Sequence, residues 1–170
     1  QHRFIAFHTM MRGSGKPAYV VGCAKALAER SIKVLVLDGL MYEQGAIPHQ
    51  FYELLGSTPV IKDGKNLYDL IRDYEVLCLN KDESNSDGGA RMDGPLGFPV
   101  TGLNKGRPYS DVCGRAIPLP GWPAISFLPG NNGKVVDVRE RIDFHRLYEN
   151  LDGHQFFDYV KGALSECYDV

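Results

Sequence analysis

The sequence predicts an α/β fold in which a parallel β-sheet is flanked by helices. Three segments near the start of the chain support this prediction: an apolar run at 4–7, a helical pattern at 17–30 and a second apolar run at 34–37. Short, continuous apolar runs are typical of strands that are buried on both faces, as in parallel sheets. The short connection at 31–33 favours a right-handed crossover between two neighbouring parallel strands.

The first predicted helix has one apolar face. Its apolar residues recur at spacings of three and four, while charged residues cover the other side. These apolar residues are Ala18, Val21, Ala24, Leu27 and Ala28. Pro17 falls at the start of the helix, where proline is tolerated because the N–H that it lacks would have no intrahelical acceptor. The strand at 34–37 then ends in Asp38 and Gly39.

The middle of the chain predicts two further helices and an irregular excursion. A short helix is expected at 48–55, and Asn66 is placed to cap the next helix. Glycine, proline, serine and aspartate then dominate residues 80–121, which we interpret as an irregular excursion with a hairpin near Ala116 and Ile117.

The last part of the chain predicts a third strand and two helices. The strand is expected at 124–128, and the helices at about 139–149 and 153–166. We interpret 1–170 as a single, partial α/β domain that stops before its next strand.

Composition excludes several classes of protein. The chain has 170 residues, of which 44% are hydrophobic, and this is enough for one domain with a proper core. Its formal net charge of −2 gives no direct signal of nucleic-acid binding, which needs a basic excess. The sequence shows neither a membrane-spanning apolar run nor a signal-peptide pattern. We therefore expect a cytoplasmic protein.

The cysteines give no sign of a metal site. Cys23, Cys78, Cys113 and Cys167 are scattered and form no C-x-x-C pair. The histidines do not complete a zinc-ligand spacing with them. We expect reduced, mostly buried thiols.

A Gly-Ser-Gly-Lys loop at 13–16 is the main candidate site. Glycines allow backbone N–H groups to surround an anion, the following helix adds its positive end, and the lysine reaches phosphate oxygens. The full phosphate-loop pattern is only partly present, because Met10 replaces its first glycine and Pro17 its hydroxyl residue. The candidate phosphate-binding residues are Arg12, Gly13, Ser14, Gly15, Lys16, Pro17 and Ala18.

Pro17 and Asp38 limit the chemistry of this site. The hydroxyl that usually follows the lysine ligates Mg²⁺, and proline offers none, so metal-dependent hydrolysis is expected to be impaired. Asp38 follows a predicted parallel strand, where carboxylates face the ligand crevice. It could hold Mg²⁺ through water or position a nucleophile, or it could be a turn aspartate before Gly39.

Several segments together resemble the ParA/MinD-like ATPases, the deviant Walker A branch of the P-loop NTPases (SIMIBI-like). The resemblance is carried by Phe-His-Thr-Met-Met-Arg-Gly-Ser-Gly-Lys-Pro at 7–17, by 26–30 and 33–38, and by Phe-Leu-Pro-Gly at 127–130. It implies a P-loop fold cut before its Walker B strand, binding of ATP or ADP with Mg²⁺, catalytic roles for Lys16 and Asp38, a nucleotide-dependent homodimer in the intact protein, and an unidentified protein partner.

Three positions depart from the pattern of this family. Met11 stands where the family has its signature lysine, Pro17 replaces the hydroxyl ligand, and Leu40 replaces the second acid of Asp-x-Asp. We therefore expect an adenine-nucleotide-binding domain, with ATPase activity only if the parent protein is active. The alternatives are a catalytically inactive regulatory or scaffold module and a small phosphometabolite or dinucleotide enzyme. The absence of G-x-G-x-x-G argues against the second of these.

Overall fold

The computed structural model describes residues 3–7, 15–42, 45–84, 111–133, 136–137 and 140–170. Its sheet contains β1 (Val34–Leu37), β2 (Ile117–Leu119) and β3 (Trp122–Leu128) in the order β1-β3-β2. β1 runs parallel to β3, whereas β2 is antiparallel to β3.

The prediction of a parallel sheet of the P-loop type is wrong, because the sheet is small and mixed. A tight turn at Pro120 and Gly121 reverses the chain direction between β2 and β3. Gly121 has the positive φ of 78° that this turn requires. β2 and β3 therefore form a hairpin, next to the position where the sequence placed one.

The predicted first strand at 4–7 is also absent: its residues are exposed and form no β-ladder. The side of β1 where such a strand would pair is already used by the end of the chain. Asp169 N–H donates to Lys33 O (2.9 Å), and Leu35 N–H donates to Val170 O (2.8 Å). Without that strand, the predicted strand-helix-strand unit around 17–30 is not formed.

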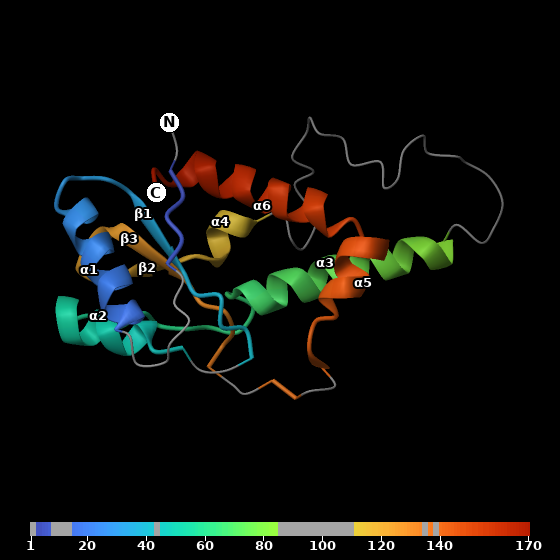
Figure 1. The fold of residues 1–170 in the computed structure, drawn as a ribbon, viewed down its shortest axis with the longest axis horizontal. Coiled ribbons are helices and arrows are strands. Elements are labelled where there is room, and N and C mark those ends of the chain that lie inside the picture. Colours follow the sequence, from blue (N-terminus) through green and yellow to red (C-terminus); the bar gives the residue numbers. More distant parts are fainter. Residues whose placement is uncertain (1–2, 8–14, 43–44, 85–110, 134–135, 138–139) are drawn as a thin grey trace.

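Helices cover both faces of the sheet (Figure 1). α1 (Lys16–Ala28) and α2 (Ile47–Leu55) pack on one face. The helices on the other side are α3 (Leu67–Ser84), α4 (Val112–Arg115), α5 (Phe144–Asn150) and α6 (Gly153–Cys167).

Local sequence signals located most of these helices. Asn66 caps α3 as predicted, because its Oδ1 accepts the Asp69 N–H at 2.7 Å. α5 begins later than predicted, at Phe144, where the Asp143 side chain accepts the Arg146 N–H. The predicted excursion at 80–121 has regular structure at both described ends, in α3 and in α4 with β2, and 85–110 lie outside the described residues. A single domain over 1–170 stays a prediction.

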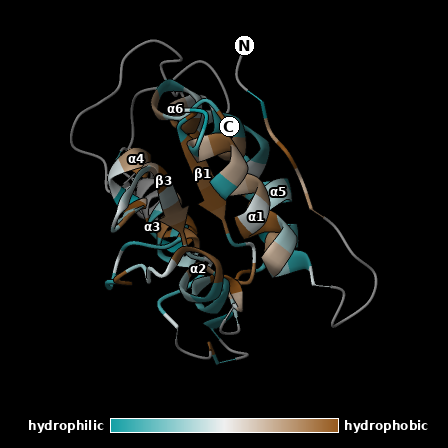
Figure 2. Cartoon of the chain, turned by 90° about the vertical axis from the view of Figure 1, so that its left-hand side faces the viewer, coloured by the Kyte–Doolittle hydropathy of each residue, from teal (hydrophilic) through white to brown (hydrophobic). Residues whose placement is uncertain are grey.

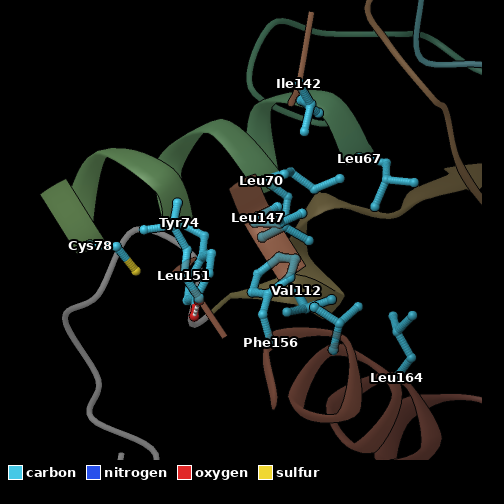
Figure 3. Close-up of a cluster of buried hydrophobic side chains, with 12 residues drawn as sticks. Leu67, Leu70, Tyr74, Cys78, Val112, Ile142, Leu147, Leu151, Phe156 and Leu164 are labelled. Atoms are coloured by element: carbon cyan, nitrogen blue, oxygen red, sulfur yellow. Dashed lines mark hydrogen bonds between the residues drawn. The ribbon is translucent and has the colours of Figure 1, made fainter. Parts of the chain in front are cut away.

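In the described part of the chain, most of the buried apolar side chains form two cores, one on each side of the sheet. The alternation of side chains along β1 separates them, because Val34 and Val36 face one core and Leu35 faces the other. The α1-side core consists of Val21, Ala24, Val34, Val36, Ile47, Phe51, Leu119, Ile125 and Phe127. The α6-side core, shown in Figure 3, consists of Leu67, Leu70, Ile71, Tyr74, Cys78, Val112, Ile142, Leu147, Leu151, Phe156, Val160 and Leu164.

The centre of the α6-side core is a pair of stacked rings. Tyr74 of α3 and Phe156 of α6 have ring centroids 4.4 Å apart, and the Tyr74 hydroxyl donates to Leu151 O. The hydrogen bond satisfies the one polar atom of a side chain that is only 1% exposed. α3 and α6 are therefore joined by packing that does not depend on the sheet.

The expectation of reduced thiols is wrong for two of the four cysteines. Cys113 of α4 and Cys167, the last residue of α6, form a disulfide with their Cα atoms 6.7 Å apart. The pairing joins residues 54 positions apart, and no local spacing in the sequence indicates it. Cys23 and Cys78 are not part of a disulfide.

Candidate functional site

The structure brings the two predicted catalytic residues, Lys16 and Asp38, to one cavity. Lys16 is the first residue of α1 and Asp38 directly follows β1. Both line a cavity of about 690 Å³, together with Pro17. The start of a helix and the end of a strand therefore meet at one cavity, and the catalytic roles of Lys16 and Asp38 stay predictions.

Asp38 is held by backbone groups on two sides. Its N–H donates to Leu128 O (3.0 Å) at the end of β3, and its Oδ1 accepts the Leu40 N–H (3.0 Å). Gly45 packs directly against the carboxylate, since a Cβ on Gly45 would overlap Asp38 Oδ2. Asp38 therefore acts as a turn residue, which is one of the two roles considered from the sequence. The hydrogen bond from Leu40 and the contact with Gly45 set the orientation of its side chain.

The environment of Asp38 favours its neutral form. Burial raises the pKa of the carboxyl above its ordinary value of 3.8, while the Leu40 N–H and the positive charge of Lys16 act in the opposite direction. Lys16 lines the same cavity, so its positive charge lies near the part of the cavity where Asp38 is. An anion bound there would experience the same positive charge.

The start of α1 offers backbone donors as well. Gly15 precedes the helix in the left-handed conformation (φ 71°), and the first helical bond runs from Tyr19 N–H to Gly15 O (3.2 Å). The N–H groups of Lys16 and Ala18 lie in the first turn, where an α-helix has no acceptor for them. Pro17 contributes no N–H, so the helix start presents fewer donors than a standard phosphate loop.

Apart from Pro17, none of the remaining predicted binding residues that the structure describes is found in the lining of the cavity. Arg12, Gly13 and Ser14 lie outside the described residues. Gly15 and Ala18 do not line the cavity, although both belong to the start of α1. The described residues contain no cluster of three or more His, Cys, Asp or Glu side chains that could hold a metal ion. A water-mediated Mg²⁺ contact of Asp38 therefore stays a prediction.

Most of the cavity wall is apolar and comes from α1, β1 and the segment 3–7. α1 contributes Val20, Cys23 and Leu27, and residues 3–7 line the cavity as well. Figure 2 shows that part of this segment is strongly hydrophobic. The cavity is thus largely apolar, with Lys16 and Asp38 in its lining and Arg3 and Asp169 as further charged lining residues.

The C-terminal residues 168–170 line the same cavity, which the sequence did not predict. The backbone of Asp169 forms hydrogen bonds with two other segments. Its N–H donates to Lys33 O, and its carbonyl oxygen accepts the Arg3 N–H (3.1 Å). The Lys33 N–H in turn donates to Asp169 Oδ2 (2.9 Å). These partners are far apart in the sequence, so no local pattern could have revealed the contact.

Comparisons with known proteins return no matching family model, no matching curated protein and no matching solved structure. The resemblance to ParA/MinD-like ATPases therefore stays a prediction from the residues that carry it. Within the described part of the chain, no helix combines the length and apolar character needed to cross a bilayer.

Proposed function

We propose that the cavity at the start of α1 and the end of β1 binds an adenine nucleotide, with its phosphates beside Lys16. The observation that carries this proposal is the position of Lys16 and Asp38 on one cavity, with the Lys16 charge acting on Asp38. A helix start with a lysine favours phosphate through both the helix dipole and the ammonium charge.

The rest of the cavity suits the other half of a nucleotide. Val20 and Leu27 offer an apolar wall against which a base could pack. Lys16 lines the same cavity as Asp38, so its positive charge would offset the repulsion between the Asp38 carboxylate and a bound phosphate.

The proposal is for binding without efficient hydrolysis. Pro17 supplies no hydroxyl for Mg²⁺, and Leu40 supplies no carboxylate to orient water. Asp38 is the residue that would hold Mg²⁺ through water. A nucleotide-dependent homodimer and a protein partner belong to the same hypothesis. So does a cytoplasmic location, although the Cys113–Cys167 disulfide is more typical of an oxidising compartment.

The direct test measures ATP and ADP affinity by calorimetry, with and without Mg²⁺. Lys16→Ala should weaken binding at least about tenfold, because a charged hydrogen bond contributes roughly 1.5–3 kcal/mol. Lys62→Ala is the matched control, since Lys62 is exposed and does not line the cavity. Wild-type protein that binds neither nucleotide at millimolar concentration would refute the proposal, as would equal affinity in the Lys16→Ala variant.

One observation favours the alternative of an inactive regulatory or scaffold module. Large apolar side chains are exposed around the cavity: Phe4 is 59% exposed, Ile5 53% and Leu40 48%. Exposed apolar residues that are neighbours in space are typical of surfaces that contact another molecule. A folded wild-type protein that binds no nucleotide, with a Lys16→Ala variant whose circular dichroism spectrum equals that of wild type, would support this alternative.

A further inference from the structure

The Cys113–Cys167 disulfide joins α4, which is held on several sides, to the last turn of α6. α4 is firmly held: Val112 is fully buried, and Arg115 donates to Gly64 O (2.8 Å) and to the Asp73 carboxylate. Lys65 Nζ also donates to Gly114 O at 2.8 Å. Cys113 therefore lies on a short helix that is fixed on several sides without the disulfide.

The body of α6 is fixed without the disulfide, whereas its end has fewer packing contacts, of which Tyr168 against the α6-side core is one. Phe156, Val160 and Leu164 are buried in the α6-side core. Beyond Leu164, the side chains of α6 and the following residues are half-buried or exposed, and Cys167 is the last helical residue. Loss of the disulfide would therefore leave most of α6 in place and remove the one covalent restraint on its last turn.

That last turn leads directly into the segment that covers the edge of β1. Residues 168–170 follow Cys167, and both Asp169 and Val170 bond to Lys33 or Leu35 through their backbones. Asp169 also accepts the Arg3 N–H, so the extended segment 3–7 is held through the same residue. One covalent bond thus restrains both segments that line this end of the cavity.

We propose that the Cys113–Cys167 disulfide is a redox latch that holds residues 168–170 against β1. A dithiol reductant opens it: one thiolate attacks a protein sulfur to form a mixed disulfide, and the second thiolate displaces the remaining protein sulfur. The protein gains two electrons and two protons as two thiols, and the dithiol becomes a disulfide. Both cysteines are half-buried, so a reductant can approach them from solvent.

Opening the latch exposes the backbone of β1. The Leu35 N–H and the Lys33 carbonyl lose their partners, which leaves an unpaired strand edge. The segment 3–7 loses its bond to Asp169, so this end of the cavity opens to solvent. The proposal concerns the position of the chain end and does not depend on nucleotide binding.

The test compares amide hydrogen exchange in the oxidised protein and after treatment with a dithiol. Exchange at Leu35 and Val170 should accelerate at least about tenfold on reduction, because several backbone hydrogen bonds are lost together. Exchange in α3 at Leu70 and Tyr74 should stay unchanged, since this helix is held by the α6-side core. A Cys113→Ser variant should show the reduced pattern and give no response to the dithiol.

Three results would overturn the latch. The first is a thiol titration of the denatured, purified protein that finds four thiols, which would mean that the disulfide does not form. The second is unchanged exchange at Leu35 after reduction. The third is equal acceleration in α3, which would mean that the disulfide stabilises the whole fold and does not act locally.

Discussion

Replacing Gly130 by alanine tests the close approach of the ends of β1 and β3, on which the candidate site depends. A Cβ at this position would overlap the Leu40 carbonyl and come within 2.9 Å of Asp38 O. Both obstacles are backbone atoms, which cannot rotate away as a side chain would. On its other side, Gly130 O accepts the Tyr68 N–H (2.9 Å), so the glycine has little room to retreat.

The expected cost follows from this geometry. Overpacking a well-packed site costs about 1–3 kcal/mol, and the backbone obstacles place Gly130→Ala near about 3 kcal/mol. For a protein of this size, each kcal/mol lowers Tm by about 2–4 °C, so the variant should melt about 6–12 °C below wild type. Differential scanning calorimetry at matched pH and protein concentration measures this shift.

Gly39→Ala is the matched control, one residue from Asp38. A Cβ there meets nothing within 4 Å, and the φ of Gly39 lies outside the left-handed region. Alanine at such a position removes freedom from the unfolded chain and stabilises a protein by about 0.4–1 kcal/mol. If Gly130→Ala melted within 2–3 °C of Gly39→Ala, the proposed contact between the two strand ends would be wrong.

Two further predictions concern Asn66 and Asp38. Asn66→Ala removes the cap of α3 at a side chain that is only 1% exposed, so it should lower the free energy of unfolding by about 2 kcal/mol in urea titrations. An unchanged midpoint would mean that the cap does not stabilise α3. Asp38→Asn keeps an oxygen for the Leu40 N–H and removes the buried charge. Because the folded pKa is raised, the wild-type carboxyl loses stability as pH rises through that pKa, so the variant should have the higher Tm at pH 7. This advantage should disappear below the ordinary pKa of 3.8, and an equal advantage at both pH values would contradict the assignment.

The correct predictions came from residues whose preferred conformation is set locally. Pro17 indicated a helix start and Asn66 a helix cap, and each reflects the chemistry of one residue and its neighbours. The strand at 34–37 and the turn at Asp38 followed in the same way from an apolar run that ends in a turn-forming pair. Lys16 and Asp38 line one cavity because these elements end there, but a role of the two residues in binding stays a prediction.

The incorrect predictions depended on contacts between distant parts of the chain. The apolar run at 4–7 has the composition of a buried strand, but composition does not show which segment pairs with β1. Asp169 and Val170 take that position, and their sequence carries no strand pattern. The disulfide and the direction of β2 likewise depend on how the chain folds back, which hydrophobic periodicity does not encode.

The position of Trp122 has a practical consequence for studies in solution. It is the single tryptophan of the chain, its indole N–H donates to Leu55 O (3.3 Å), and it packs against the α1-side core. Its fluorescence therefore reports on α1 and α2, whereas circular dichroism is dominated by the longer helices α3 and α6. Denaturation curves from the two signals would coincide if the sheet couples its two sides, and would separate if each side melts independently.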